Sequence, residues 1–337
     1  MRRSRSRARL IALVLGGAGL VGAGAPRPVR AQGITQAQGA EFLLLPVGAR
    51  ATALGQAATA DGGTTEAIFW NPAGLASVPR AEFAVHHYDA FFGSGDAVAL
   101  AAHSASLGTV AVAAYVVNYG DLDLTAREGS GVPIGRISPR NVALSVSYAT
   151  EVGGGVDVGV TYKLVQFRVD CSGDCTDVPA SIGTSHAVDV GVRFTPAGIP
   201  LVVGVSLRNV GFPLQVENSA QADPLPARFS VGVAYVLVRP VVSPHPEEHF
   251  DVRVLADVQG ALRRGQETPV ALVGLESGVG DLIRIRGGYA FLDSDARGPS
   301  LGVGIKVGGM SLDIARVFFA NDIGEKEPFH VSMRAEF

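Results

Sequence analysis

Histidine is the residue type whose placement in this sequence comes nearest to catalysis or metal binding. His86 and His87 are neighbours in an alternating segment, so their side chains point to opposite faces of a strand and form no chelating pair on one wall. His103 or His330 could serve a serine as a general base, but no spacing in the sequence supports such a pair. We therefore expect a protein that is not an enzyme, with no metal site and no cofactor.

The first 31 residues have the composition of a secretory signal peptide. Residues 10–25 are weakly apolar, the small-residue site Val29-Arg30-Ala31 follows, and a basic head comes first: Arg2, Arg3, Arg5, Arg7 and Arg9. No later segment has the roughly 18 uninterrupted apolar residues that a membrane-spanning helix needs. Without the seven basic residues of the signal, the chain has 21 basic and 31 acidic residues. This net charge of −10 does not favour nucleic acid as a partner.

The two cysteines, Cys171 and Cys175, lie four residues apart in a segment that is otherwise predicted to be a loop. Because an exported chain enters an oxidising compartment, an isolated pair favours a disulfide, and Gly173 eases the tight bend. The ring is small, so we expect its stabilisation to be modest and local. The aspartates nearby have no fixed spacing and indicate a solvated loop rather than a metal site.

From residue 81 onward, apolar and polar residues alternate between clusters of turn residues. The pattern predicts fourteen strands, at 81–91, 96–106, 108–119, 140–151, 156–170, 185–196, 201–211, 227–238, 249–262, 269–278, 281–291, 299–307, 310–319 and 329–337. Their number is even, and the connections between them are alternately long and short, with few exceptions. Bacterial outer-membrane barrels have both properties. We therefore predict an all-β fold, a 14-stranded antiparallel transmembrane β-barrel over residues 81–337.

One face of the predicted strands is apolar and the other carries charges. In 249–259, for example, Phe250, Val252 and Val254 alternate with Asp251 and Arg253. A Lys or Arg that faces lipid at the midplane costs about 2–4 kcal/mol, so the charged face must line the lumen. The predicted lumenal charges are six of each sign: Asp157, Asp189, Asp251, Asp257, Asp313 and Glu336, with Lys163, Arg193, Arg253, Arg284, Arg286 and Arg334. This balance favours ion pairs between strands over an ion-selective pore.

Aromatic residues gather near the predicted strand ends, as two belts at the surfaces of a bilayer would require. On the outer side they are Phe91, Phe92, Tyr119, Phe167, Phe291, Phe318, Phe319 and Phe329, and on the periplasmic side Phe194, Phe250 and Phe337. A second pattern is a sector of small apolar residues: Ala97, Ala99, Ala101, Ala111 and Ala113. This sector indicates either close packing against a plug or a passage for a hydrophobic ligand.

The last predicted strand ends at Phe337, the final residue. Phe329, Val331, Met333 and Ala335 share its apolar face, and polar residues occupy the other. A terminal strand that ends in an aromatic residue resembles the C-terminal assembly signal of outer-membrane barrels. The resemblance implies that Phe337 is part of this signal and that the barrel assembly machinery and outer-membrane lipids are partners.

Residues 32–80 do not alternate, and we expect them to form a hatch or plug inside the barrel. They contain the runs GARATALGQA at 48–57 and WNPAGLA at 70–76. Asn71 can cap a short helix that has Pro72 at its first position, and Gly74 permits a sharp exit. Together with the barrel, these runs resemble the PorV/PorQ family within the superfamily of FadL long-chain fatty-acid transporters. The resemblance matches Asn71, Pro72, Ala73 and Gly74 to the hatch motif of FadL-type proteins.

The family resemblance implies an outer-membrane protein, and it leaves two functions open. The first is an accessory of type IX protein secretion that handles exported proteins at the cell surface, with secreted cargo or secretion-system proteins as partners. The alternative is a FadL-like channel for long-chain fatty acids or other hydrophobic small molecules. A secretion role predicts a plugged lumen, whereas a transport role predicts an apolar space that binds a ligand.

Overall fold

The protein is described from a computed structural model of residues 38–125, 133–175, 181–216, 222–238, 250–262, 268–279, 282–292, 298–319 and 327–337. The predicted signal peptide, residues 1–31, lies outside the described residues. Among the helices in these ranges, none is long and apolar enough to cross a membrane.

Short helical elements come first in the chain, and strands follow. The helical elements are η1 (Glu41–Leu44), α1 (Ala49–Ala53), α2 (Ala67–Trp70) and η2 (Pro72–Ser77). The strands are β1 (Ala81–Ala90), β2 (Gly93–Ser104), β3 (Gly108–Asn118), β4 (Leu122–Thr125), β5 (Pro133–Gly153), β6 (Val156–Gly173), β7 (Ser181–Phe194), β8 (Leu201–Gly211), β9 (Leu214–Val216), β10 (Ala222–Asp223), β11 (Arg228–Val238), β12 (Phe250–Ala261), β13 (Val270–Val279), β14 (Ile283–Ala290), β15 (Gly298–Val307), β16 (Met310–Val317) and β17 (Phe329–Glu336).

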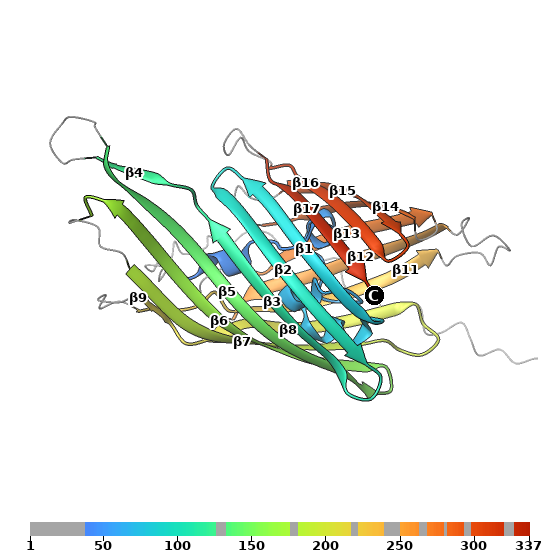
Figure 1. Ribbon diagram of the computed structural model, residues 1–337. Helices are drawn as coiled ribbons and strands as arrows, with labels where there is room; N and C mark the ends of the chain where they lie inside the picture. Colours follow the sequence, from blue (N-terminus) through green and yellow to red (C-terminus); the bar gives the residue numbers. More distant parts are fainter. Residues whose placement is uncertain are drawn as a thin grey trace, which may run out of the picture. The chain divides into compact units, whose positions relative to one another are not determined.

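Fourteen long strands in the described ranges form one closed antiparallel barrel (Figure 1). Each pairs with the next long strand along the chain, and three short strands, β4, β9 and β10, add to this ring. Strand β1 pairs with β17 and closes the barrel, where the N–H of Ala81 donates to the carbonyl of Phe337 at 3.2 Å. A closed barrel leaves no strand edge unpaired, as lipid requires. The predicted fold is confirmed.

The two ends of the barrel differ. At one end, the turn end, strands are joined by short turns such as Gly154-Gly155 between β5 and β6. At the other, the loop end, β5, β6 and β7 extend beyond their neighbours (Figure 1). The disulfide Cys171–Cys175 lies at the loop end and confirms the predicted pairing. The predicted strands 108–119 and 140–151 leave residues 120–139 as a loop, and this prediction is wrong in part, because β4 and the start of β5 pair there.

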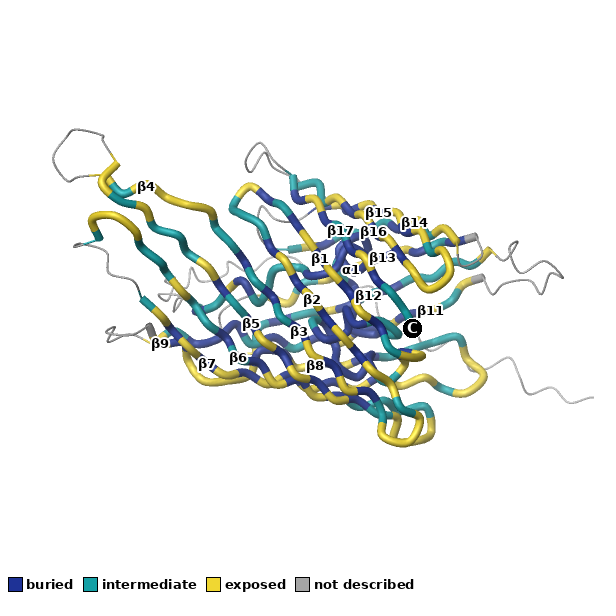
Figure 2. Tube along the Cα trace, in the orientation of Figure 1, coloured by how far each residue is buried: buried dark blue, intermediate teal, exposed yellow. Residues whose placement is uncertain are grey.

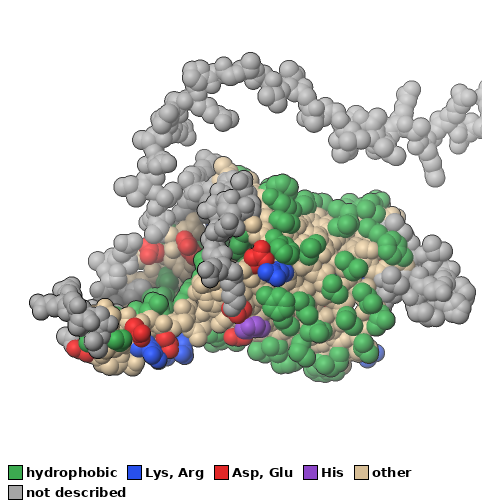
Figure 3. Space-filling model, turned by 90° about the horizontal axis from the view of Figure 1, so that it is seen from above, with side chains coloured by type: hydrophobic (Ala, Val, Ile, Leu, Met, Phe, Trp, Pro, Cys, Tyr) green, Lys and Arg blue, Asp and Glu red, His purple; other side chains and the backbone are tan. Residues whose placement is uncertain are grey.

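The outer face of the barrel is apolar along most of each strand. Buried and exposed residues alternate (Figure 2), and Val110, Val112 and Leu301 are among the exposed apolar side chains. Hydrophobic side chains cover the broad part of the face seen in Figure 3, and the visible charges lie mainly near its middle and opposite end. One outer-face charge, Arg316, is the last residue but one of β16 and pairs with Glu327 at 2.6 Å near the loop end.

The N-terminal segment, residues 39–80, lies inside the ring of strands (Figure 1). Helix α1 contacts β14 to β17, and η2 contacts β3 and β5 to β7. The alanine sector of β2 and β3 packs against this segment: Ala99, Ala101, Ala111 and Ala113 form one buried cluster with Ile68, Leu75 and Val78. The small residues therefore serve close packing and do not line a passage.

We predict that a charge on the outer face destabilises the barrel according to its depth. Val112→Lys places an ammonium group near the middle of β3 and should cost about 2–4 kcal/mol of folding free energy in a bilayer. Leu107→Lys, in the exposed turn between β2 and β3, should cost almost nothing. Urea unfolding of protein inserted in phosphatidylcholine vesicles measures both, and equal midpoints would contradict a lipid-facing β3.

Candidate functional site

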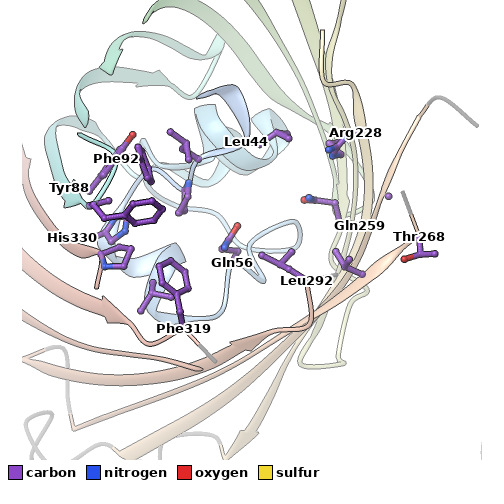
Figure 4. A pocket seen from close by; sticks show the side chains of 18 residues that line it. Leu44, Gln56, Tyr88, Phe92, Arg228, Gln259, Thr268, Leu292, Phe319 and His330 are labelled. Carbon is purple, nitrogen blue, oxygen red and sulfur yellow. The ribbon is translucent and has the colours of Figure 1, made fainter. Parts of the chain in front are cut away.

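A cavity of about 580 Å³ lies in the lumen at the loop end. Its lining is mainly apolar and comes from the N-terminal segment and from the ends of several strands (Figure 4). The residues are Leu44, Leu45, Pro46, Gln56, Tyr88, Ala90, Phe91, Phe92, Arg228, Gln259, Gly260, Thr268, Val270, Leu292, Val317, Phe319, Pro328 and His330. A space of this size and composition suits a small molecule with a large apolar body.

Aromatic and polar side chains occupy opposite sides of the cavity. Tyr88, Phe92, Phe319 and His330 gather on one side in Figure 4, and Arg228 and Gln259 stand on the other. The rings of Tyr88 and His330 stack with centroids 5.3 Å apart. The Tyr88 hydroxyl is hydrogen-bonded to that of Tyr115 at 3.0 Å, so the ring rather than the hydroxyl faces the cavity's contents.

Two arginines are direct neighbours on the polar side. Arg228 of β11 pairs in register with Arg208 of β8, and both are buried. The Nη2 group of Arg208 donates to Gln259 Oε1 at 2.7 Å, its Nη1 group donates to the Phe69 carbonyl at 2.9 Å, and its guanidinium lies over the Trp70 ring. Like charges opposite each other on adjacent strands repel, and the carboxylates of Asp189 and Asp257 offset the charge of Arg208.

The N-terminal segment is tied to the wall beneath the cavity through Asn71. Asn71 is the N-cap of η2: its Oδ1 accepts from the N–H of Ala73 at 3.1 Å, and Pro72 follows at the first position. Its Nδ2 donates to the carbonyls of Thr59 at 2.6 Å and Val192 at 3.3 Å. Asn71 is fully buried, so each lost bond would leave a buried polar group unpaired.

Inward-facing glycines on six strands let the segment's atoms approach the wall directly. A Cβ at any of them would come closer to the segment than real Cβ atoms do, in most cases against its backbone. They are Gly159 on β6, Gly191 on β7, Gly204 on β8, Gly274 on β13, Gly288 on β14 and Gly302 on β15. We call these six residues the glycine seat. A glycine in a strand commonly marks such a close approach.

Charged side chains connect the segment to the wall on the side of β12 to β17. Arg50 of α1 pairs with Asp61 and with Glu276 of β13, and Arg253 donates to Asp61 at 2.8 Å. Arg286 continues the network from Glu276 to Asp313, at 2.6 Å each. Burial alone would raise the pKa of Asp61, but Arg50 and Arg253 outweigh it and hold that pKa below its usual range.

Eleven of the twelve predicted lumenal charges form ion pairs, either with one another or with Asp61 and Lys306, which the sequence analysis did not place in the lumen. The pairs are Asp157–Arg193, Lys163–Asp189, Asp251–Arg284, Arg286–Asp313, Arg334–Asp313, Arg253–Asp61 and Glu336–Lys306. Asp257 instead accepts from the N–H of Thr59 at 2.8 Å. Most of these bonds join neighbouring strands or bind the segment, so they stiffen the lumen.

The histidines form no catalytic arrangement in the described residues. His86 is buried inside and His87 lies outside, where it pairs with Asp96 at 2.7 Å. His86 Nδ1 is 2.8 Å from Ser332 Oγ, but that oxygen also accepts from the N–H of Ala49, and both side chains are buried. The contact anchors α1. No group of three or more His, Cys, Asp or Glu in the described part of the chain could hold a metal ion.

Comparison with sequence families gives a match over most of the chain. Residues 20–244 match the family described as "Uncharacterised protein family (UPF0164)". The chain belongs to this family. A comparison with curated proteins finds no match.

Solved structures with a similar fold are FadL-type barrels. The toluene transporter TbuX of Ralstonia pickettii is 14% identical, with a TM-score of 0.56 over 86% of this chain and 98% of that one. The P. putida toluene transporter TodX is 12% identical, with a TM-score of 0.56 over 86% and 98%. A Pseudomonas aeruginosa FadL homologue is 12% identical, with a TM-score of 0.53 over 87% and 99%. At these identities the likeness is evidence for the fold. The narrower resemblance to PorV/PorQ stays a prediction.

Sequence reasoning missed the cavity and misplaced part of its lining. Phe92 and Phe319, predicted in an outer belt, line the cavity, and Tyr119 and Phe167 pack against buried clusters instead of facing lipid. Arg50 was also missed, although a lone arginine in the small-residue run 48–57 is a visible signal of a buried ion pair. The predicted hatch residues Asn71 to Gly74 all lie in the segment within the barrel.

We predict that Gly288→Ala loosens the N-terminal segment. Its Cβ would collide with the backbone at Leu54 and Gly55, whereas the neighbouring Gly287 has space for a Cβ. Amide exchange over residues 49–57, followed by mass spectrometry, should become about tenfold faster in Gly288→Ala, equivalent to about 1.4 kcal/mol. Gly287→Ala is the matched control. Equal exchange rates in both variants would contradict the conclusion that the glycine seat holds the N-terminal segment.

A second prediction concerns Asn71. Asn71→Ala removes the cap and leaves the Thr59 carbonyl unpaired, which together should destabilise the segment by about 2–3 kcal/mol. Trypsin should then cut after Arg50 sooner, while heat-modifiable migration of the barrel is unchanged. Asn118→Ala, at the loop end of β3, serves as control. Unchanged protection of Arg50 in Asn71→Ala would show that the cap does not hold the segment.

Proposed function

We propose that this protein resides in the outer membrane, binds small hydrophobic molecules in its lumenal cavity and passes them across that membrane. The observation that carries the proposal is the apolar cavity of about 580 Å³ at the loop end. Small-molecule sites have volumes of about 300–1,000 Å³ and a few polar groups in an apolar lining. Tyr88, Phe92 and Phe319 supply the apolar surface, and Arg228 and Gln259 supply polar groups.

The membrane location is supported by the closed barrel and its apolar outer face. Short turns of such barrels face the periplasm and longer connections face the outside, so the loop end and its cavity would face the cell exterior. The cavity is thus placed to receive molecules from outside.

The transport part of the proposal is supported by the similar folds of two toluene transporters and of a monoaromatic hydrocarbon channel. The type IX secretion role expected from the sequence has no such support. No feature of the described residues favours it, and we do not put it forward as a second candidate.

We predict that filling the cavity stops uptake. Leu292→Trp adds bulk to the cavity lining, and Leu301→Trp makes the same change on the outer face of the adjacent strand β15. Cells that produce the full chain should accumulate radiolabelled naphthalene faster than cells without it. Leu292→Trp should lower this rate to about half or less, because the larger side chain takes up cavity volume that the ligand needs. Leu301→Trp should leave the rate unchanged.

Membrane levels of both variants are checked by heat-modifiable migration on gels. Uptake at the background rate in the wild type, or equal uptake by the two Trp variants, would contradict the proposed function.

A further inference from the structure

Gln56 occupies an unusual backbone conformation in the floor of the cavity. Helix α1 ends in a Schellman-type turn: the N–H of Gly55 donates to the Thr52 carbonyl at 3.1 Å, and the N–H of Gln56 donates to the Ala51 carbonyl at 3.0 Å. Gly55 has φ +62°, as this turn requires. Gln56 has φ 67°, which the turn does not require. Residues other than glycine rarely adopt a positive φ.

The side chain of Gln56 also differs from what the turn usually contains. A hydrophobic residue commonly follows the glycine of a Schellman turn and packs back on the helix. Here the residue is an amide that lines the cavity, and Figure 4 shows it between the aromatic group and the Arg228–Gln259 side. In the described part of the chain, no hydrogen bond to its side-chain amide is found. Strain of this kind tends to be kept where it serves a function.

We propose that Gln56 selects the ligand: its amide hydrogen-bonds a polar group, so the cavity prefers an apolar molecule that carries a hydroxyl, carbonyl or carboxylate group over a pure hydrocarbon. The inference rests on the proposed function and adds a ligand class to it. Its two supports are independent: the positive φ, and the amide that lines the cavity and has no hydrogen-bond partner among the described residues.

The surroundings fit such a ligand. Its ring or chain would lie against Phe92 and Phe319, and its polar group would reach Gln56 and then Gln259 across the cavity. Gln259 is itself oriented, because Arg208 donates to its Oε1 at 2.7 Å and leaves its amide N–H groups as donors. Two amides therefore offer donors from different directions.

The test compares two probes of the same shape, 1-naphthol and 1-methylnaphthalene, which differ by a hydroxyl in place of a methyl group. Binding is measured by fluorescence on the full chain in phosphatidylcholine nanodiscs. The ratio of the two Kd values is compared between variants, so partition into lipid cancels. Gln56→Met keeps the length of the side chain and removes the amide, and Gln56→Gly removes the amide and relieves the positive φ. Gln166→Met, on β6 outside the cavity lining, is the matched control.

Both Gln56 variants should shift the ratio against 1-naphthol by about three- to tenfold, the range of one net hydrogen bond. Gln166→Met should leave it at the wild-type value. If either Gln56 variant keeps the wild-type ratio, or if Gln166→Met shifts it equally, the assignment of Gln56 is overturned while the proposed function stands. If the wild type binds neither probe above Leu292→Trp, the proposed function itself fails, and the inference with it.

Discussion

The contact between the glycine seat and the backbone of the N-terminal segment is the constraint on which the rest of the interior depends. Protein interiors are close-packed, and even one methyl group at these positions has no room. Because the seat spans strands on both sides of the barrel, from Gly159 of β6 to Gly302 of β15, it fixes the segment's path across the lumen. The cavity is the space that remains between this path and the loop end.

The buried charges follow from that placement. Arg50 is nearly inaccessible to solvent inside the barrel, and a buried guanidinium is tolerated only with full pairing. The wall supplies Glu276 and the segment supplies Asp61, which Arg253 of the wall shares. Neither the wall nor the segment satisfies these charges alone. The segment and the barrel therefore each need the other to pair their buried charges. A loosely inserted plug would not have this mutual dependence.

The strands could be predicted from the sequence because a period of two is a local signal, and one lipid-facing side enforces it along each strand. The short strands β4, β9 and β10 were missed, since they extend the ring beyond the lipid-facing band and lack that enforcement. The cavity was missed for another reason. Phe92 and Phe319 lie beyond the regular strand ends, where alternation no longer decides between lipid and lumen, and only the three-dimensional arrangement turns them inward.

The two runs that suggested a family also have a structural explanation. In GARATALGQA, Ala53, Leu54 and Gly55 contact the seat, and in WNPAGLA, Asn71 and Pro72 do so. The presence of these residues is explained by the fit of the segment inside a barrel of this fold. They are therefore no evidence for the handling of a secreted cargo. Gln56 belongs to the first run but does not contact the seat. It follows Gly55 directly, so the turn that anchors the segment also holds the Gln56 amide in the cavity. Gly55 therefore packs against the wall, and the next residue selects the ligand.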